Sequence, residues 1–307
     1  MKWSKRGLVY APDGSVEWAQ RYAFPPTPMQ LDESTLRIYL AFCDANTVGR
    51  IAYLDVDAND PSRVLRVAKK PILDIGEPGM FDENGILPTS VIRVGDELYM
   101  YYVGYQLGYK VRYFQFEGLA ISRDNGESFQ RYSRVPVIDR SDAEALNRTS
   151  AFVMKDGDTF RMWYTAGGEW TVGAHAKALP IYNLRYIESP DGKEWPRAGK
   201  IAVDFAFEDE HALGRPWIYQ DTDRWRMFFS SRTRSKDYRI GVAESTDRGQ
   251  TWIRKDDEIG IDVSESGWDS QMIAYASVVE VNGRVYMFYN GNSCGASGFG
   301  FAELESW

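Results

Sequence analysis

The chain of 307 residues has few of the residues that build metal sites and disulfide frameworks. It contains two cysteines, Cys43 and Cys294, and two histidines, His175 and His211. Two cysteines make no disulfide framework, and two histidines argue against a zinc site of the usual His/Cys type. We therefore expect neither a metal nor another cofactor.

Long apolar runs and an excess of positive charge are also missing. No run reaches the roughly 18 apolar residues of a membrane helix, and no apolar segment of a signal peptide follows the first residues, MKWSKR. The net charge is −8, whereas nucleic-acid binding needs a basic surface. The chain also lacks a glycine-rich phosphate loop and a Gly-x-Ser-x-Gly elbow. We expect a cytoplasmic protein that binds neither membranes nor nucleic acid.

What the sequence does contain is one strand-like phrase in five copies. The copies are RIYLAF at 37–42, ELYMYY at 97–102, TFRMWY at 159–164, RWRMFF at 224–229 and RVYMFY at 284–289, and they are spaced by 60, 62, 65 and 60 residues. A fixed long period of short strands is typical of radial repetition. Each unit is longer than a WD40-type blade of about 40–45 residues and suits four strands. The prediction is an all-β, five-bladed β-propeller with four-stranded blades, forming a single domain over residues 1–307.

The two ends of the chain are out of phase with this repeat. The last repeat, 272–304, contains only three strands, and residues 5–11 form a lone strand before the first full repeat. If the N-terminal strand becomes the fourth strand of the last blade, the ring closes and no edge is exposed. We therefore predict that the N-terminal strand closes the last blade.

A turn motif recurs between the third and fourth strands. It reads SRDNGESF at 122–129, SPDGKEW at 189–195 and STDRGQTW at 245–252, and it resembles the Asp-box of sialidase-type propellers. The Asp accepts backbone N–H bonds across the turn, and the Gly supplies a positive φ. These aspartates are therefore expected to be structural and not catalytic.

Loops at one end of a propeller axis are the usual binding site. The loops before the inner strands cover 21–27, 81–84, 147–149, 211–215 and 268–271, and they form a polar ring with the ends of the second strands. Its carboxylates Asp82, Asp269 and Glu169 are the candidate catalytic residues, because two carboxyl groups can cleave a glycosidic bond. The alternative is that each caps a loop or forms a salt bridge.

Two arginines, Arg148 and Arg215, hold equivalent positions in adjacent repeats. Together they would suit a carboxylate or a phosphate, or they neutralise nearby acidic side chains. We predict that His211 belongs to the site and that His175, in the loop 171–180, overhangs it. The aromatic content of 14% serves packing between sheets, or in part a sugar pocket, because the apolar face of a sugar stacks on aromatic rings. The remaining predicted substrate-binding residues are Tyr105, Trp170, Arg232, Gln271, Asn290 and Asn292.

Two segments carry a resemblance to a known superfamily. The second repeat, with GMFDENGILPTSVI at 79–92 and LYMYYVG at 98–104, resembles the five-bladed glycoside hydrolases, which include families 43, 32, 62, 68 and 130. The last repeat, with GWDSQMI at 267–273, YNGN at 289–292 and GFGFA at 298–302, is similar to uncharacterised bacterial family 43-like proteins, some of them linked to surface polysaccharides. The resemblance spans the whole chain.

Family 43 enzymes place an Asp base in the first blade, an Asp in the second and a Glu acid in the third, and this resemblance carries over only in part. The first inner strand, YAFPPTP at 22–28, has no carboxylate, and the second matches through Asp82. In the third, the position is taken by residues 147–149 (NRT), and the nearest acids are Glu144 and Glu169.

Three hypotheses follow. The first is a carbohydrate-active enzyme that acts on a glycosidic or sugar-phosphate bond of an anionic or nucleotide-linked sugar in the axial pocket. The second is a glycan-binding propeller without catalysis, and the third is a scaffold in polysaccharide assembly. Two carboxylates about 5–10 Å apart across the pocket would favour hydrolysis. A pocket dominated by arginine and aromatic side chains would favour binding or transfer.

Overall fold

The computed structural model describes residues 1–172 and 178–307, so His175 lies outside the described residues. The described chain is all β, with twenty strands, one short α-helix, α1 (Asn292–Gly295), and one 3-10 helix (Asp256–Glu258). Within these ranges, no helix is long and apolar enough to cross a membrane. Of the predicted loop 171–180, the described residues 171–172 and 178–180 are strand, because they extend a hairpin whose pairing runs from Glu169↔Ile181 to Val172↔Ala178.

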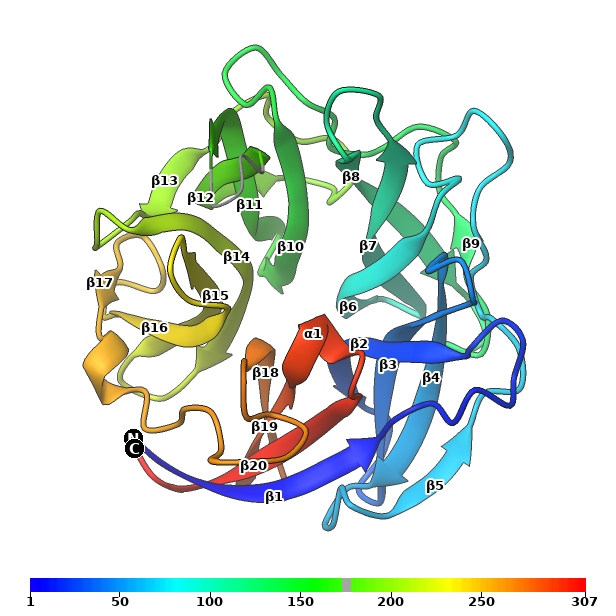
Figure 1. Ribbon diagram of the computed structural model, residues 1–307, viewed down its shortest axis with the longest axis vertical. Coiled ribbons are helices and arrows are strands. Elements are labelled where there is room, and N and C mark those ends of the chain that lie inside the picture. Colours follow the sequence, from blue (N-terminus) through cyan, green and yellow to red (C-terminus); the bar gives the residue numbers. More distant parts are fainter. Residues whose placement is uncertain (173–177) are drawn as a thin grey trace.

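The strands form two four-stranded sheets and one twelve-stranded sheet, and the antiparallel pairs of the large sheet divide it into three further groups of four. Figure 1 shows these groups around a central axis. The first group contains β2 (Arg21–Gln30), β3 (Thr35–Cys43), β4 (Gly49–Asp57) and β5 (Val64–Val67). The second contains β6 (Ile86–Val94), β7 (Glu97–Leu107), β8 (Tyr113–Ser122) and β9 (Gln130–Arg131). The third contains β10 (Asn147–Asp156), β11 (Thr159–Val172), β12 (Ala178–Ser189) and β13 (Lys200–Val203).

The fourth group contains β14 (Glu210–Gln220), β15 (Trp225–Thr233), β16 (Arg239–Ser245) and β17 (Ile253–Arg254). The fifth contains β18 (Ala274–Val281), β19 (Arg284–Asn290), β20 (Phe299–Ser306) and β1 (Lys2–Tyr10). Single parallel pairs, Arg148↔Phe116 and Tyr182↔Ala212, join the second group to the third and the third to the fourth.

The five copies of the repeated phrase lie in the second strands, β3, β7, β11, β15 and β19, as the sequence predicted. Their aligned residues, Leu40, Met100, Met162, Met227 and Met287, are all fully buried. Each pair of neighbouring groups shares an apolar cluster. The cluster of Leu40 and Phe42 with Phe288 and Phe301 joins the fifth group to the first. The core therefore lies between the groups.

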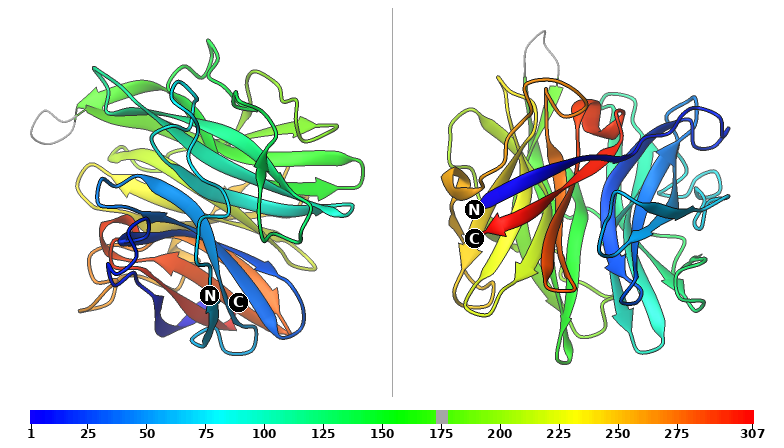
Figure 2. Two further views of the ribbon diagram at one scale, coloured as in Figure 1. Left: turned by 90° about the vertical axis from the view of Figure 1, so that its right-hand side faces the viewer. Right: turned by 90° about the horizontal axis from the view of Figure 1, so that it is seen from below.

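The two ends of the chain meet in the fifth group. Strand β1 pairs antiparallel with β20 from Lys2↔Ser306 to Tyr10↔Phe299, which confirms the predicted pairing of the N-terminal strand. Figure 2 shows β1 in blue beside β20 in red, with the two termini next to each other. The Trp3 ring lies edge-on to Phe228 of the fourth group, with 6.2 Å between ring centroids.

The Asp-box turns have the predicted structural role. Asp124 Oδ1 accepts the Ser128 N–H, Asp191 Oδ1 accepts two backbone N–H groups, and Asp247 Oδ1 accepts two more. The glycines that follow have positive φ values of 84°, 70° and 81°.

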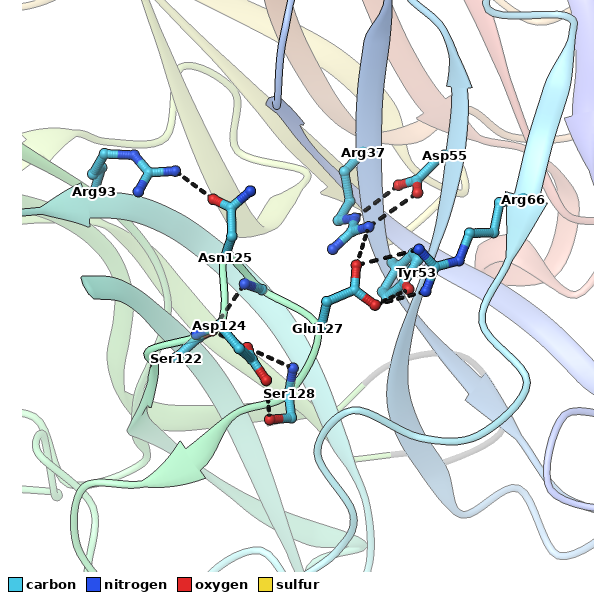
Figure 3. A network of polar contacts seen from close by, with 11 residues as sticks. Arg37, Tyr53, Asp55, Arg66, Arg93, Ser122, Asp124, Asn125, Glu127 and Ser128 are labelled. Atoms are coloured by element: carbon cyan, nitrogen blue, oxygen red, sulfur yellow. Dashed lines mark hydrogen bonds and ion pairs between the residues drawn. The ribbon is translucent and has the colours of Figure 1, made fainter. Parts of the chain in front are cut away.

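The first Asp-box also joins the second group to the first through Glu127 (Figure 3). Its carboxylate accepts hydrogen bonds from Arg37 Nη2 at 2.8 Å, Arg66 Nη2 at 2.6 Å and the Tyr53 hydroxyl at 2.7 Å. Arg37 is itself paired with Asp55 through Nε at 2.7 Å and Nη2 at 3.0 Å. This network fixes the outer edge of one group to the turn of the next.

Replacing Glu127 with Gln should lower stability in a pH-dependent way. Partial burial acts to raise the pKa of Glu127, but hydrogen bonds from Arg66, Tyr53 and Arg37 outweigh it and lower the pKa to about 2. The carboxylate therefore stabilises the fold above its ordinary pKa of 4.5, and this contribution is lost as the pH falls towards 2. Because the carboxylate is partly exposed, we expect about 1 kcal/mol at pH 7, the upper end for exposed pairs.

The measurement is the difference in Tm between wild type and Glu127→Gln at pH 7, 5, 4 and 3. The control is Glu77→Gln, because Glu77 and its partner Arg134 are both largely exposed. A Tm difference that is zero at pH 7, or that grows on acidification, contradicts the assignment.

Candidate functional site

Each inner strand breaks its register at the same place. The breaks lie between Phe24 and Thr27, Pro88 and Ser90, Thr149 and Phe152, Gly214 and Trp217, and Ala274 and Ser277. Inside three of them, Ser150, Arg215 and Tyr275 have φ values of 56°, 54° and 60°, a region that non-glycine residues seldom adopt. Bulges of this kind turn a side chain away from its regular direction, often beside a functional site.

A pocket with a cavity volume of about 120 Å³ lies over these breaks. All five inner strands contribute to its lining, so the pocket lies on the central axis. Its wall contains seven aromatic side chains: Phe24, Tyr105, Tyr113, Trp170, Tyr182, Tyr238 and Tyr275. The other lining residues are Pro25, Leu87, Gln115, Leu146, Asn147, Ser150, Thr165, Pro180, Gly214 and Arg215. None of these described lining residues is an Asp or a Glu.

The phenol groups of the pocket form neutral hydrogen-bonding sites. The hydroxyls of Tyr182 and Tyr238 lie 2.9 Å apart, and Gln115 Nε2 donates to the Tyr105 hydroxyl at 2.9 Å. Burial raises the pKa of Tyr238 to about 12 and raises the pKa values of Tyr105 and Tyr182 further above the ordinary value of 10. At physiological pH each hydroxyl therefore remains protonated and can both donate and accept.

Arg215 is the only formally charged residue among those that the structure places in the pocket lining. Its Nη1 donates to Thr89 O at 3.1 Å, and its Nη2 donates to Pro26 O at 3.0 Å, Thr27 Oγ1 at 2.9 Å and Ser277 Oγ at 3.4 Å. The guanidinium therefore ties the inner strands of the first, second and fifth groups to its own strand, β14. Two polar atoms of the lining, Arg215 Nε and Asn147 Oδ1, are buried without a hydrogen-bond partner among the described residues.

Glu117 of β8 is a further charged group near the axis, and the sequence analysis did not single it out. It is fully buried, and its oxygens accept from the Thr89 hydroxyl at 2.5 Å and the Thr149 hydroxyl at 3.3 Å. Burial raises its pKa to about 8. It does not line the pocket.

The predicted carboxylates Asp82 and Asp269 lie outside the pocket lining, in two contacts of the same design. Asp82 Oδ2 accepts the Tyr102 hydroxyl at 3.0 Å and Arg131 Nε at 2.7 Å. Asp269 Oδ2 accepts the Tyr289 hydroxyl at 3.0 Å and Lys5 Nζ at 2.7 Å. Each acid thus joins the loop before an inner strand to the second and fourth strands of its own group.

Burial acts to raise the pKa of Asp269, but hydrogen bonds from Lys5, Ser264 and Tyr289 outweigh it and lower the pKa. The placement of Asp82 and Asp269 therefore does not favour the predicted catalytic role, which stays a prediction.

The third and fourth groups contain variants of the same contact. Glu144 pairs with Arg148 Nε at 2.5 Å and accepts from the Tyr164 hydroxyl. Glu210 pairs with Arg254 Nη1 at 2.7 Å and accepts from Ser231. Arg148 is therefore engaged in an internal ion pair, and the structure does not bring it together with Arg215 in the pocket.

The other predicted residues divide between the pocket rim and structural contacts. Tyr105 and Trp170 line the pocket, whereas Glu169 is exposed in a shallower neighbouring pocket that also includes Arg185. The other four residues make contacts within the protein. His211 Nδ1 is hydrogen-bonded to Pro180 O, and Arg232 lies beside the Tyr238 ring. Asn290 donates to Ala23 O and Gly298 O, and Asn292 accepts from the backbone N–H of Gln271.

The chain matches no family model, but it has full-length relatives. It is 35% identical over 306 residues to the uncharacterized protein Rv1502 of Mycobacterium tuberculosis H37Rv, with all of both chains covered, and equally similar to MT1551 of strain CDC 1551.

Solved structures share its fold at low sequence identity. A structure described as a glycoside hydrolase has a TM-score of 0.74 at 19% identity, with 98% of this chain and 90% of the other covered. A structure from the GH130 family of mannoside phosphorylases has a TM-score of 0.72 at 14% identity, with 98% of this chain and 93% of the other covered. A thermostable family-43 glycoside hydrolase has a TM-score of 0.69 at 17% identity, with 96% of this chain and 90% of the other covered. The chain therefore has the propeller-type all-β fold of these structures, and it belongs to the family of Rv1502.

Proposed function

We propose that the protein is a carbohydrate-binding, five-bladed propeller that holds a saccharide in its axial pocket. The observation that carries the proposal is the lining: seven aromatic side chains, neutral amide and hydroxyl groups, and no carboxylate among the described residues. Aromatic rings stack on the apolar face of a sugar, and a few placed polar groups orient its hydroxyls. The packing of the fifth strand group on the first supports the blade count.

Hydrolysis is less well supported by the same lining. A glycosidase needs two carboxyl groups about 5–9.5 Å apart on either side of the bond. Asp82 and Asp269 are held in ion pairs outside the pocket, and Glu169 lies in the neighbouring one. Recognition without bond cleavage is therefore the first candidate function, with polysaccharide assembly as its proposed setting.

A carbohydrate-active enzyme is the second candidate, and Glu117 favours it. A carboxyl group with a pKa near 8 is protonated at neutral pH, as a general acid must be. Its carboxyl group accepts a hydrogen bond from Thr149, two residues after the lining residue Asn147.

The test is a thermal-shift screen of the whole protein against mono- and oligosaccharides, followed by an assay for released sugars. A saccharide present at 100 times its Kd should stabilise the fold by ~2.7 kcal/mol. Binding without turnover supports the first candidate, and turnover supports the second. If no saccharide shifts the Tm, both fail.

Replacing Trp170 with Ala should weaken saccharide binding with little loss of stability. The Trp170 ring lines the pocket and is 36% exposed, so its removal leaves no buried cavity. A lost stacking contact is worth roughly 0.5–1.5 kcal/mol, which corresponds to a ~2- to 12-fold weaker Kd. The measurement is calorimetry with the best saccharide from the screen.

Tyr132→Ala is the matched control, because Tyr132 is an exposed ring outside the lining. Equal weakening in both variants, or none in Trp170→Ala, would remove stacking at this wall from the proposal.

A further inference from the structure

The positive charge of Arg215 has no carboxylate partner, unlike that of other buried arginines. Arg37, Arg148, Arg161 and Arg226 have side chains at most 6% exposed, and each contacts an Asp or Glu. Arg215 is equally buried, at 3%, yet among the described residues its guanidinium hydrogen-bonds only to carbonyl and hydroxyl oxygens and lies 5.5 Å from the centroid of the Trp217 ring. A buried charge is costly unless it is paired.

The charge persists at neutral pH. Burial lowers the pKa of Arg215 to about 9, and nearby Glu117 acts to raise it. Burial also raises the pKa of Glu117. Among the described residues, no hydrogen bond or ion pair joins the Arg215 guanidinium to Glu117 or to any other carboxylate.

Two buried polar atoms of the pocket-lining residues have no hydrogen-bond partner among the described residues. Arg215 Nε is a buried donor without a partner, and the Asn147 side chain, 4% exposed, has a buried Oδ1 without a partner among the described residues. Both residues line the pocket. Arg215 Nε can donate to a carboxylate, and Asn147 Oδ1, which only accepts, can take the hydrogen of a sugar hydroxyl.

We infer that the pocket selects an acidic saccharide, a sugar that carries a carboxylate, and that this carboxylate binds at Arg215 beside Asn147. The inference rests on the proposed function, because it assumes that a saccharide occupies the pocket. The aromatic walls would contact the ring, and the single charged position at the floor would fix its orientation.

The first test varies the ligand and leaves the protein intact. Glucuronate, galacturonate and mannuronate are each compared by calorimetry with the corresponding neutral hexose and with the methyl ester of the acid. The ester keeps the ring and removes the charge. For at least one sugar, we expect the acid to bind at least ~10-fold more tightly than both, the ratio for a lost charged hydrogen bond.

The outcomes separate this inference from the proposed function. If a hexose or an ester binds as tightly as its acid, the inference is overturned and saccharide binding stands. If glucose 6-phosphate binds more tightly than every uronate, the assignment to a carboxylate is overturned. If none of these sugars nor any saccharide of the screen binds, the proposed function fails, and the inference fails with it.

The second test changes Asn147, since changes at Arg215 would also break the ties between inner strands. Asn147→Asp adds a carboxylate to the lining, and we expect it to weaken binding of the acidic sugar at least ~10-fold more than binding of its neutral counterpart. Asn46→Asp is the control, because it makes the same charge change on an exposed loop. Equal weakening of acidic and neutral sugars by Asn147→Asp overturns the inference.

Discussion

A chain that begins at residue 12 should aggregate or lose most of its stability. Strand β1 supplies one edge of the fifth group, and its loss would expose the backbone of β20 along the whole register from Phe299 to Ser306. An unpaired edge is a template for association with other chains. The same deletion removes the buried Trp3 and the partner of Asp269, Lys5.

The measurements are thermal unfolding and size-exclusion chromatography of the truncated and full-length proteins. Trp3→Ala is the control that keeps the strand and removes only its buried ring, and it should cost ~3–5 kcal/mol without aggregation. If the truncated protein melts like the full one and stays monomeric, β1 is dispensable, and the role of the N-terminal strand in completing the fold is refuted.

The strands could be predicted because their pattern is local and repeated. Each second strand contains a run of mostly apolar and aromatic residues around a buried Leu or Met, and nearly the same spacing recurs along the five copies. The pairing of β1 with β20 is not local, but it followed from counting: one strand was left over and one was missing. Repetition thus gave information that a single strand does not contain.

The location of the pocket could be predicted from the sequence, but only some of its lining residues could. Tyr105, Trp170 and Arg215 lie at strand ends that the repeat identified, and all three line the pocket. Tyr182 and Tyr275 were missed. Tyr275 lies in a register break, with a φ of 60°, and a bulge reverses the alternation from which a side chain's direction is inferred.

The contacts of Asp82 and Asp269 could not be predicted from the sequence, because their partners are distant in the chain. Arg131 is 49 residues from Asp82, and Lys5 is 264 residues from Asp269. Tyr102 and Tyr289, which complete the two contacts, occupy the last position of the repeated phrase. A search for an acid, a tyrosine and a cation in register across repeats would have indicated a structural contact.

Replacing Asp82 with Asn should therefore destabilise the protein and leave ligand binding nearly unchanged. Asp82 is fully buried, and the amide would leave Arg131, whose side chain is 20% exposed, without its charge partner. Breaking a buried ion pair costs roughly 3–5 kcal/mol, and the partial exposure of Arg131 places our expectation near ~3 kcal/mol. Asp269→Asn should have a similar but smaller effect, since Lys5 is more exposed.

A double-mutant cycle with Arg131→Met distinguishes this structural role from catalysis. If the two residues act as a pair, the loss of stability in the double variant should be smaller than the sum of the losses in the single variants. Saccharide affinity, measured on folded protein, should stay within about threefold, the change that less than 1 kcal/mol produces. The opposite pattern is an Asp82→Asn protein that melts like wild type and has lost a sugar-cleaving activity at least 10²-fold, the low end for a general acid or base. That pattern would support Asp82 as a catalytic residue and make hydrolysis the better-supported function.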